Sequence, residues 1–131
     1  NKKSGVAGLV GGSSDMRDLE NAVAAGDERA IMTLDVYNYR IKKYIGAYAA
    51  AMGGCDILVW TGGVGENQWA TRRVVCENME YMGMKIDVEK NEGMRGEEMV
   101  ISTPDSKVTI IVVPTDEEYM IAADTMDILG K

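Results

Sequence analysis

Histidine is absent from all 131 residues of this sequence. The chain therefore lacks the commonest general base near neutral pH and the usual nitrogen ligand of zinc. Cysteine is scarce as well: Cys55 and Cys76 stand far apart and form no C-x-x-C motif, which favours buried free thiols over a disulfide or a metal pair. Any catalysis within this chain has to come from carboxylates, arginine, lysine or the backbone.

Long apolar runs and excess positive charge are also missing. The strand-like runs at residues 57–60 and 108–113 fall far below the roughly 20 residues of a membrane-spanning helix, and no signal-peptide pattern opens the chain. The 14 lysines and arginines face 21 acidic residues, which leaves a net charge of -7. This sign opposes binding to nucleic acid or to an anionic membrane. We expect a soluble, cytoplasmic protein with neither as a partner.

The first half of the chain is predicted to be helical. Residues 5–14 are glycine-rich and loop-like, and Ser13 or Ser14 is placed to cap a helix over residues 15–25. Apolar side chains then recur at steps of three, four and seven, which predicts a long amphipathic helix over residues 27–52 that ends at a glycine pair. The apolar stripe of this helix consists of Ala30, Leu34, Tyr37, Ile41, Tyr44, Tyr48 and Met52.

The long helix also carries a basic patch in an otherwise acidic chain. Arg40, Lys42 and Lys43 are most simply interpreted as a solvated face, with a ligand surface as the alternative. The 10 methionines and 6 tyrosines stand mostly at helical spacing. They indicate core packing rather than a cofactor site.

The second half alternates strands and helices. Residues 57–60 form a continuous apolar run, as expected for a strand covered on both faces, and residues 66–82 follow as a helix. Residues 108–113 predict a second clear strand, and residues 116–129 predict the last helix. Two short strands are expected at residues 84–86 and 99–102, and a charged surface segment is expected between them at residues 88–98.

This order of elements predicts an α/β layered domain, with residues 1–131 as a single domain. The long helix precedes any strong strand, and the chain begins at Asn1 rather than at a methionine. We therefore expect the sheet to lack strands that an upstream segment would supply.

The most informative motif is the strand that breaks into glycines, I-L-V-W-T-G-G-V-G-E-N, at residues 57–67. Glycines let a backbone approach a ligand closely, and the free N–H groups of a helix start attract anions. Phosphate binding and a plain tight turn both fit this pattern. The run matches neither a P-loop nor the Rossmann fingerprint, which would need glycine in place of Gln68. Glu66 is either a ligand contact or an acid that stabilises the helix dipole.

Two polar clusters flank this motif. The segment S-S-D-M-R at residues 13–17 offers Arg17, whose planar guanidinium suits a phosphate or an adenine, although a capped and solvated helix start is the favoured explanation from these residues alone. The segment P-T-D-E-E at residues 114–118 supplies oxygen ligands of the kind that hold Mg²⁺. The same acids stabilise the start of a helix capped by Thr115.

Taken together and in order, these segments resemble the C-terminal part of the acetate kinases, the acetokinase family. The resemblance rests on residues 13–20, 39–54, 61–67 and 114–118. It implies the sugar-kinase, Hsp70 and actin superfamily, in which a nucleotide lies between two ribonuclease H-like domains. The expected fold is then an incomplete, C-terminal portion of an actin-like ATPase.

The resemblance also implies site residues, with ATP or ADP and Mg²⁺ as cofactors. The implied nucleotide contacts are Asp15, Met16, Arg17, Gly63, Val64, Gly65, Glu66 and Asn67. The magnesium-associated glutamate of the family corresponds to Glu117. Asp116 stands where the family usually has asparagine and adds a negative charge beside that site.

The activity implied by the resemblance is reversible transfer of the ATP γ-phosphoryl group to acetate, which gives acetyl phosphate and ADP. The acetate pocket and the catalytic residues of the family belong to the part upstream of Asn1, so we assign no catalytic residue here and expect this chain alone to be inactive. A homodimer is the implied assembly. The alternatives are a propionate or butyrate kinase of the same family, and a non-catalytic interaction module that uses the helix at residues 27–52.

Overall fold

The centre of the molecule is a small mixed sheet. In the computed structural model, which describes residues 4–130, strand β3 (Thr109–Val112) pairs in parallel with β1 (Ile57–Trp60) and antiparallel with β2 (Met99–Val100). The register aligns Ile57 with Thr109 and Trp60 with Val112. Both clear strands were expected from the sequence, and the α/β class is confirmed.

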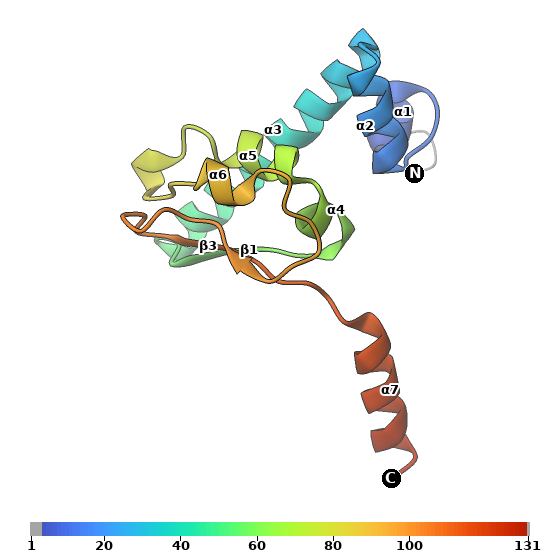
Figure 1. Cartoon of the computed structure of the whole chain (residues 1–131), viewed down its shortest axis with the longest axis vertical. Helices are drawn as coiled ribbons and strands as arrows, with labels where there is room; N and C mark the ends of the chain where they lie inside the picture. The colour runs from blue at the N-terminus through green and yellow to red at the C-terminus, as the bar shows by residue number, and fades with distance from the viewer. Residues whose placement is uncertain (1–3, 131) are drawn as a thin grey trace.

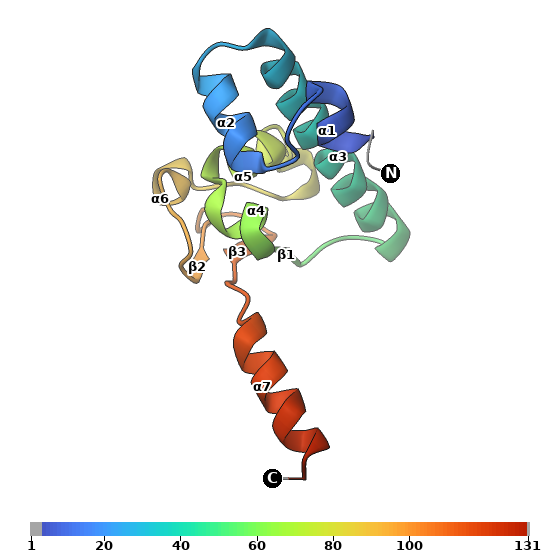
Figure 2. The same cartoon turned by 90° about the vertical axis from the view of Figure 1, so that its right-hand side faces the viewer.

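Helices cover one face of this sheet (Figure 1). The long helix α3 (Glu28–Met52) packs against α5 (Trp69–Cys76), and α5 contacts the short helix α6 (Val88–Asn91). Helices α1 (Gly5–Val10) and α2 (Met16–Ala24) pack on α3 at its end farther from the sheet (Figure 2). The packing of α3 on α5 thus joins the helical first half of the chain to the second half, which contains the sheet.

The hydrophobic core lies between the sheet and α5. Trp60, Val75, Met84, Ile101 and Ile110 are among its buried members. The opposite face of β1 is open, because Ile57 is 58% exposed and Val59 is 51% exposed. The expectation that this strand is covered on both faces is therefore wrong for the described residues.

Helix α3 agrees with its predicted bounds, and its predicted apolar stripe faces inward in the first half of the helix but not in the second. Its start is capped by Asp27, whose carboxylate accepts from the N–H groups of Arg29 (2.8 Å) and Ala30 (3.0 Å). Ala30 of the predicted stripe is buried and Ile41 packs against the core. Tyr44, Tyr48 and Met52 are exposed by 51%, 62% and 69%, and Ala49 is buried in that half instead. The helix carries apolar side chains on more than one face, so periodicity alone does not select the buried row.

Three local predictions are wrong. Residues 5–10 form helix α1 rather than a loop, and the predicted helix at residues 66–82 is broken into α4 (Gly62–Asn67), α5 and the 3-10 turn Glu80–Met82. The strand expected at residues 84–86 is reduced to one bridge between Ile86 and Ser102. Short-range propensity misplaces these boundaries because the packing of α5 on the core decides where the helix breaks.

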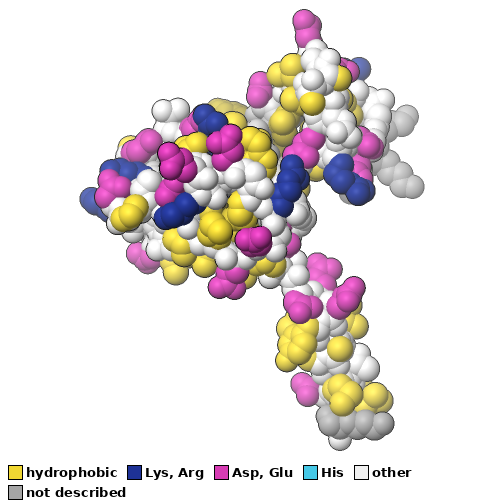
Figure 3. Space-filling view, viewed as in Figure 1, with side chains coloured by type: hydrophobic (Ala, Val, Ile, Leu, Met, Phe, Trp, Pro, Cys, Tyr) yellow, Lys and Arg dark blue, Asp and Glu magenta, His cyan; other side chains and the backbone are white. Residues whose placement is uncertain are grey.

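The last helix, α7 (Glu117–Ile128), extends away from the rest of the chain (Figure 1). None of its residues is buried, and apolar side chains such as Tyr119, Ile121 and Ile128 cover its surface (Figure 3). Among the described residues, no helix has the length and apolar character needed to cross a membrane. The start of the chain, residues 1–3, on which part of the argument for an upstream segment depends, lies outside the described residues.

Candidate functional site

A cleft joins three segments that are distant in the sequence. The start of α2, the helix α4 and the segment after α6 line a space of about 420 Å³. Figure 2 shows α2 and α4 on the same side of the molecule. The lining residues are Asp15, Met16, Arg17, Glu20, Gly63, Val64, Asn67, Gln68 and Arg95.

The α2 wall is organised by an aspartate and an arginine. Asp15 caps α2 by accepting from the Arg17 N–H (2.9 Å), and the Arg17 guanidinium donates to both carboxylate oxygens of Asp15 (3.1 and 2.7 Å). These bonds lower the pKa of Asp15 to about 2. The predicted serine cap is wrong, because Ser13 instead accepts from the Asp15 N–H at 3.0 Å. The Arg17 side chain remains 85% exposed, so its flat face is open to a planar ring or an anion.

The glycine run forms a helix of its own. Residues 62–67 are helix α4, so the expected open loop with a helix starting at Glu66 is wrong. Gly62 takes a φ of +68°. Gly65 is buried, and a Cβ there would lie 3.0 Å from the Trp60 carbonyl carbon, whereas a Cβ at Gly63 would meet nothing within 4 Å. Gly62 thus allows a turn, Gly65 allows α4 to approach β1 closely, and Gly63 leaves space open in the cleft wall.

Glu66 faces away from the cleft toward the start of α7. Its carboxylate accepts from both the backbone N–H and the hydroxyl of Thr115, each at 2.8 Å, and these bonds lower the pKa of Glu66. The predicted cap function of Thr115 is therefore wrong. Asp116 caps α7 instead by accepting from the Tyr119 N–H at 2.9 Å. One glutamate thereby links helix α4 to the segment that leads into Glu117.

Six of the eight residues expected at a nucleotide line the cleft, and two do not. Asp15, Met16, Arg17, Gly63, Val64 and Asn67 belong to the first group. Gly65 contacts β1 and Glu66 contacts Thr115, so both support the wall from behind. Glu117 lies in the exposed first turn of α7 beside Glu118.

The sequence did not reveal four residues of this region. Glu20, Gln68 and Arg95 line the cleft, and Arg72 is fully buried behind α4. Arg95 lies in the stretch that the sequence presented as a charged surface excursion. Its glycine neighbours at 93 and 96, both with positive φ, are the one local sign that this stretch folds back on the molecule.

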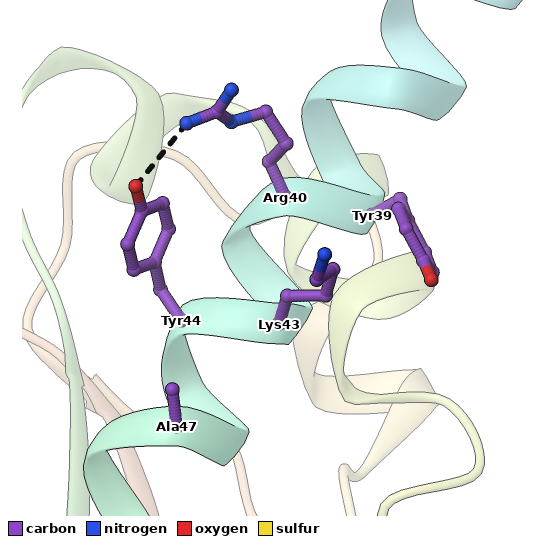
Figure 4. Close-up of a pocket in the computed structure, with 5 residues that line it drawn as sticks. All are labelled: Tyr39, Arg40, Lys43, Tyr44 and Ala47. Atoms are coloured by element: carbon purple, nitrogen blue, oxygen red, sulfur yellow. Dashed lines mark hydrogen bonds between the residues drawn. The ribbon is translucent and has the colours of Figure 1, made fainter.

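A second hollow of about 340 Å³ lies on the exposed side of α3, where Tyr39, Arg40, Lys43, Tyr44 and Ala47 meet (Figure 4). The Arg40 guanidinium donates to the Tyr44 hydroxyl at 3.2 Å, and the Lys43 ammonium lies 5.6 Å from the centre of the Tyr39 ring.

Of the basic patch predicted on α3, Lys42 does not belong to a solvated face. Its ammonium donates to the carbonyl of Glu77, next to the end of α5.

Both cysteines are free thiols, as predicted. Cys76 is buried and Cys55 is half-buried. Burial raises the pKa of the Cys76 thiol to about 12, which keeps it protonated and unreactive at neutral pH.

The model of the acetokinase family matches residues 1–123. The chain belongs to the acetokinase family. This acetokinase chain is 89% identical over its whole length to an acetate kinase of Parabacteroides distasonis, of which it covers 33%. It therefore spans about a third of the length of the curated relatives it matches.

Solved structures agree with this family. A crystal structure of Porphyromonas gingivalis acetate kinase is 67% identical, overlays with a TM-score of 0.91, and matches 98% of this chain and 32% of its own. A propionate kinase from Francisella tularensis is 34% identical with a TM-score of 0.79, over 93% of this chain and 30% of its own. The fold of this acetokinase chain is thus shared by kinases of two short-chain carboxylates and is consistent with the actin-like ATPase class.

Proposed function

We propose that this chain is the C-terminal, nucleotide-binding part of an acetate kinase, which transfers the γ-phosphoryl group of ATP reversibly to acetate. One observation carries the proposal: Asp15, Met16 and Arg17 share a cleft with Gly63, Val64 and Asn67. The family resemblance implies both groups of residues as nucleotide contacts, and their shared cleft supports that implication. ATP and acetate are cytoplasmic metabolites, and we place the protein in the cytoplasm.

The cleft suits a nucleotide in its chemistry. The exposed Arg17 plane can stack on adenine or pair with a phosphate, and Arg95 adds a second guanidinium to the cleft lining. The open space at Gly63 lets a phosphate or sugar approach the backbone closely. Phosphoryl transfer depends mainly on positioning and on neutralising charge, and this chain contributes both without histidine.

The donors present also fit magnesium. Glu117 and Glu118 are exposed carboxylates, and the described residues contain no cluster of three or more acidic, cysteine or histidine ligands. Mg²⁺ is commonly held by one or two carboxylates together with substrate phosphates rather than by a cage of protein ligands. In the proposal Glu117 holds the ion directly or through water, and the bound ion would offset phosphate charge.

The activity test uses a full-length form of the protein, as long as its relatives. Incubated with ATP, Mg²⁺ and acetate, it should form an acyl phosphate that hydroxylamine traps, whereas residues 1–131 alone should form none. Parallel reactions with propionate and butyrate decide the alternative substrates. A full-length protein inactive with all three acids would contradict the proposal. Activity of residues 1–131 alone would contradict the expectation that this part carries no catalytic residues.

A homodimer is the second part of the proposal, and the exposed aromatic face of α3 supports it. The rings of Tyr44 and Tyr48 are stacked with centroids 6.1 Å apart, and Met52 continues the same row (Figure 4 shows Tyr44). Exposed tyrosines and methionines are enriched at protein interfaces, and a second copy would cover this row. The non-catalytic interaction module would use the same surface.

We expect Tyr48→Asp to shift the full-length protein from dimer to monomer in sedimentation velocity, because a carboxylate would be buried without a partner at the contact. Tyr81→Asp is the matched control, since Tyr81 is 80% exposed and lies outside α3. A dimer that persists with Tyr48→Asp at low micromolar concentration places the interface elsewhere.

A further inference from the structure

Arg72 is a buried cation that none of the predicted functions uses. It belongs to α5 and is 0% exposed, and its guanidinium donates only to neutral acceptors. Its four oxygen acceptors are the carbonyls of Gly65 (2.7 Å), Glu66 (3.0 Å) and Met94 (2.7 Å) and the side-chain oxygen of Asn91 (2.8 Å), and the Met94 sulfur lies 3.8 Å away as a weaker acceptor. A buried charge with no carboxylate among its described hydrogen-bond partners is costly, and these bonds are what compensates for its burial.

The first two bonds stabilise the end of α4. The last carbonyls of a helix have no partner within the helix, and a helix of six residues is too short to persist alone. Arg72 supplies donors to the carbonyls of Gly65 and Glu66 at this end, where a positive charge is also favoured by the helix dipole. Arg72 is therefore one of the groups that hold the α4 cleft wall, together with the contact of Gly65 with β1 and the bonds of Glu66 to Thr115.

The other two bonds join α4 to the adjoining segment of the cleft lining. Met94 and Asn91 flank the segment that carries Arg95, and the Gly96 N–H donates to the Glu66 carbonyl at 3.1 Å. The Asn91 amide is itself fixed, because it donates to the Trp69 carbonyl at 2.9 Å. Arg72 thus sits where the two walls meet, behind the cleft and outside its lining.

Charge links Arg72 to the cleft as well. Burial lowers the pKa of Arg72, and the nearby charge of Arg95 lowers it further. The two guanidinium groups therefore repel one another. An anionic ligand held by Arg95 would reduce that repulsion. Binding of an anion in the cleft is therefore coupled electrostatically to the charge of Arg72.

We propose that Arg72 is a positioning residue for nucleotide binding: it holds helix α4 and the Arg95 segment together in the arrangement that lines the cleft and receives the nucleotide. The inference rests on the proposed function. It assigns to Arg72 no contact with the nucleotide itself.

The test compares Arg72→Lys with Arg73→Lys in the full-length protein. Lysine keeps the charge but loses the planar fork that reaches four acceptors, so Mg·ADP binding measured by calorimetry should weaken about tenfold or more. The KM for ATP should rise, while the KM for acetate should stay unchanged. Arg73 is exposed and paired with Glu77, so Arg73→Lys should leave both values unchanged. A folded Arg72→Lys protein with wild-type ADP affinity would overturn the inference.

A double-mutant cycle with Arg95→Met tests whether Arg72 acts on nucleotide binding through Arg95. If Arg72 acts by placing Arg95, the two losses in ADP affinity should be less than additive, and full additivity would refute an action of Arg72 through Arg95.

Should Arg72→Lys fail to fold, Asn91→Ala removes one of the four oxygen acceptors of Arg72 and leaves three. We expect it to weaken ADP binding severalfold, and unchanged affinity would again overturn the inference. A wild-type protein that binds no Mg·ADP would instead refute the proposed function.

Discussion

Gly65→Ala is expected to destabilise the protein by about 1–3 kcal/mol, the usual cost of overpacking a filled site. The added Cβ would lie 3.0 Å from the carbonyl carbon and 3.3 Å from the Cα of Trp60. Both atoms are backbone of β1, which pairs along its length with β3 and cannot turn aside as a flexible side chain would. The clash therefore forces α4 away from the sheet.

Thermal unfolding followed by circular dichroism measures this effect, and a fall of several degrees in Tm is the expected result. Gly63→Ala is the control in the same helix, because a Cβ there meets no atom within 4 Å and alanine favours helices over glycine. Its Tm should be unchanged or higher. Since Gly63 lines the cleft, its substitution should weaken ADP binding even so. Equal Tm values for both variants would show that α4 does not depend on close packing at Gly65.

Glu117→Gln is expected to lower the activity of the full-length kinase by about 10- to 100-fold, the usual consequence of weakening the set of groups that holds a metal. The amide keeps the size of the side chain but removes the charge that attracts Mg²⁺. The variant should therefore need more Mg²⁺ to reach half its maximal rate.

Glu118→Gln provides the control, because Glu118 stands beside Glu117 in the same exposed first turn of α7. Both substitutions remove one negative charge near the helix start and cost the helix dipole the same interaction. The Mg²⁺ dependence of acyl phosphate formation, measured for both variants, separates metal binding from helix stability. Equal losses in the two variants would refute the specific assignment of Glu117.

The sequence indicated much of the cleft lining because each of its motifs is contiguous in the chain. Asp15, Met16 and Arg17 come from one segment and Gly63, Val64 and Asn67 from another, and each segment is recognisable by its residues alone. The family resemblance groups Glu66 with them as a nucleotide contact, whereas its carboxylate contacts Thr115 in the structure. A motif says which residues occur together in the chain but not which way each side chain points.

Arg72 shows what a motif-based prediction misses. Its four acceptors lie between 6 and 22 positions away along the chain, so no periodicity or spacing rule connects them. The same holds for Arg95, which reaches the cleft because Arg72 and the Gly96 N–H hold its segment against α4. Long-range contacts of this kind depend on packing and not on local sequence.

The sequence by itself determined the family resemblance, the α/β class, the bounds of α3 and the two segments that carry the cleft motifs. These follow from local propensity and from residue identity, which the linear chain contains in full. Only the tertiary structure decided that those segments share one cleft, that the glycine run is a helix, and that Arg72 lies behind it. Burial and hydrogen bonding between distant residues selected that arrangement, because a buried polar group has to find its partners wherever the fold brings them.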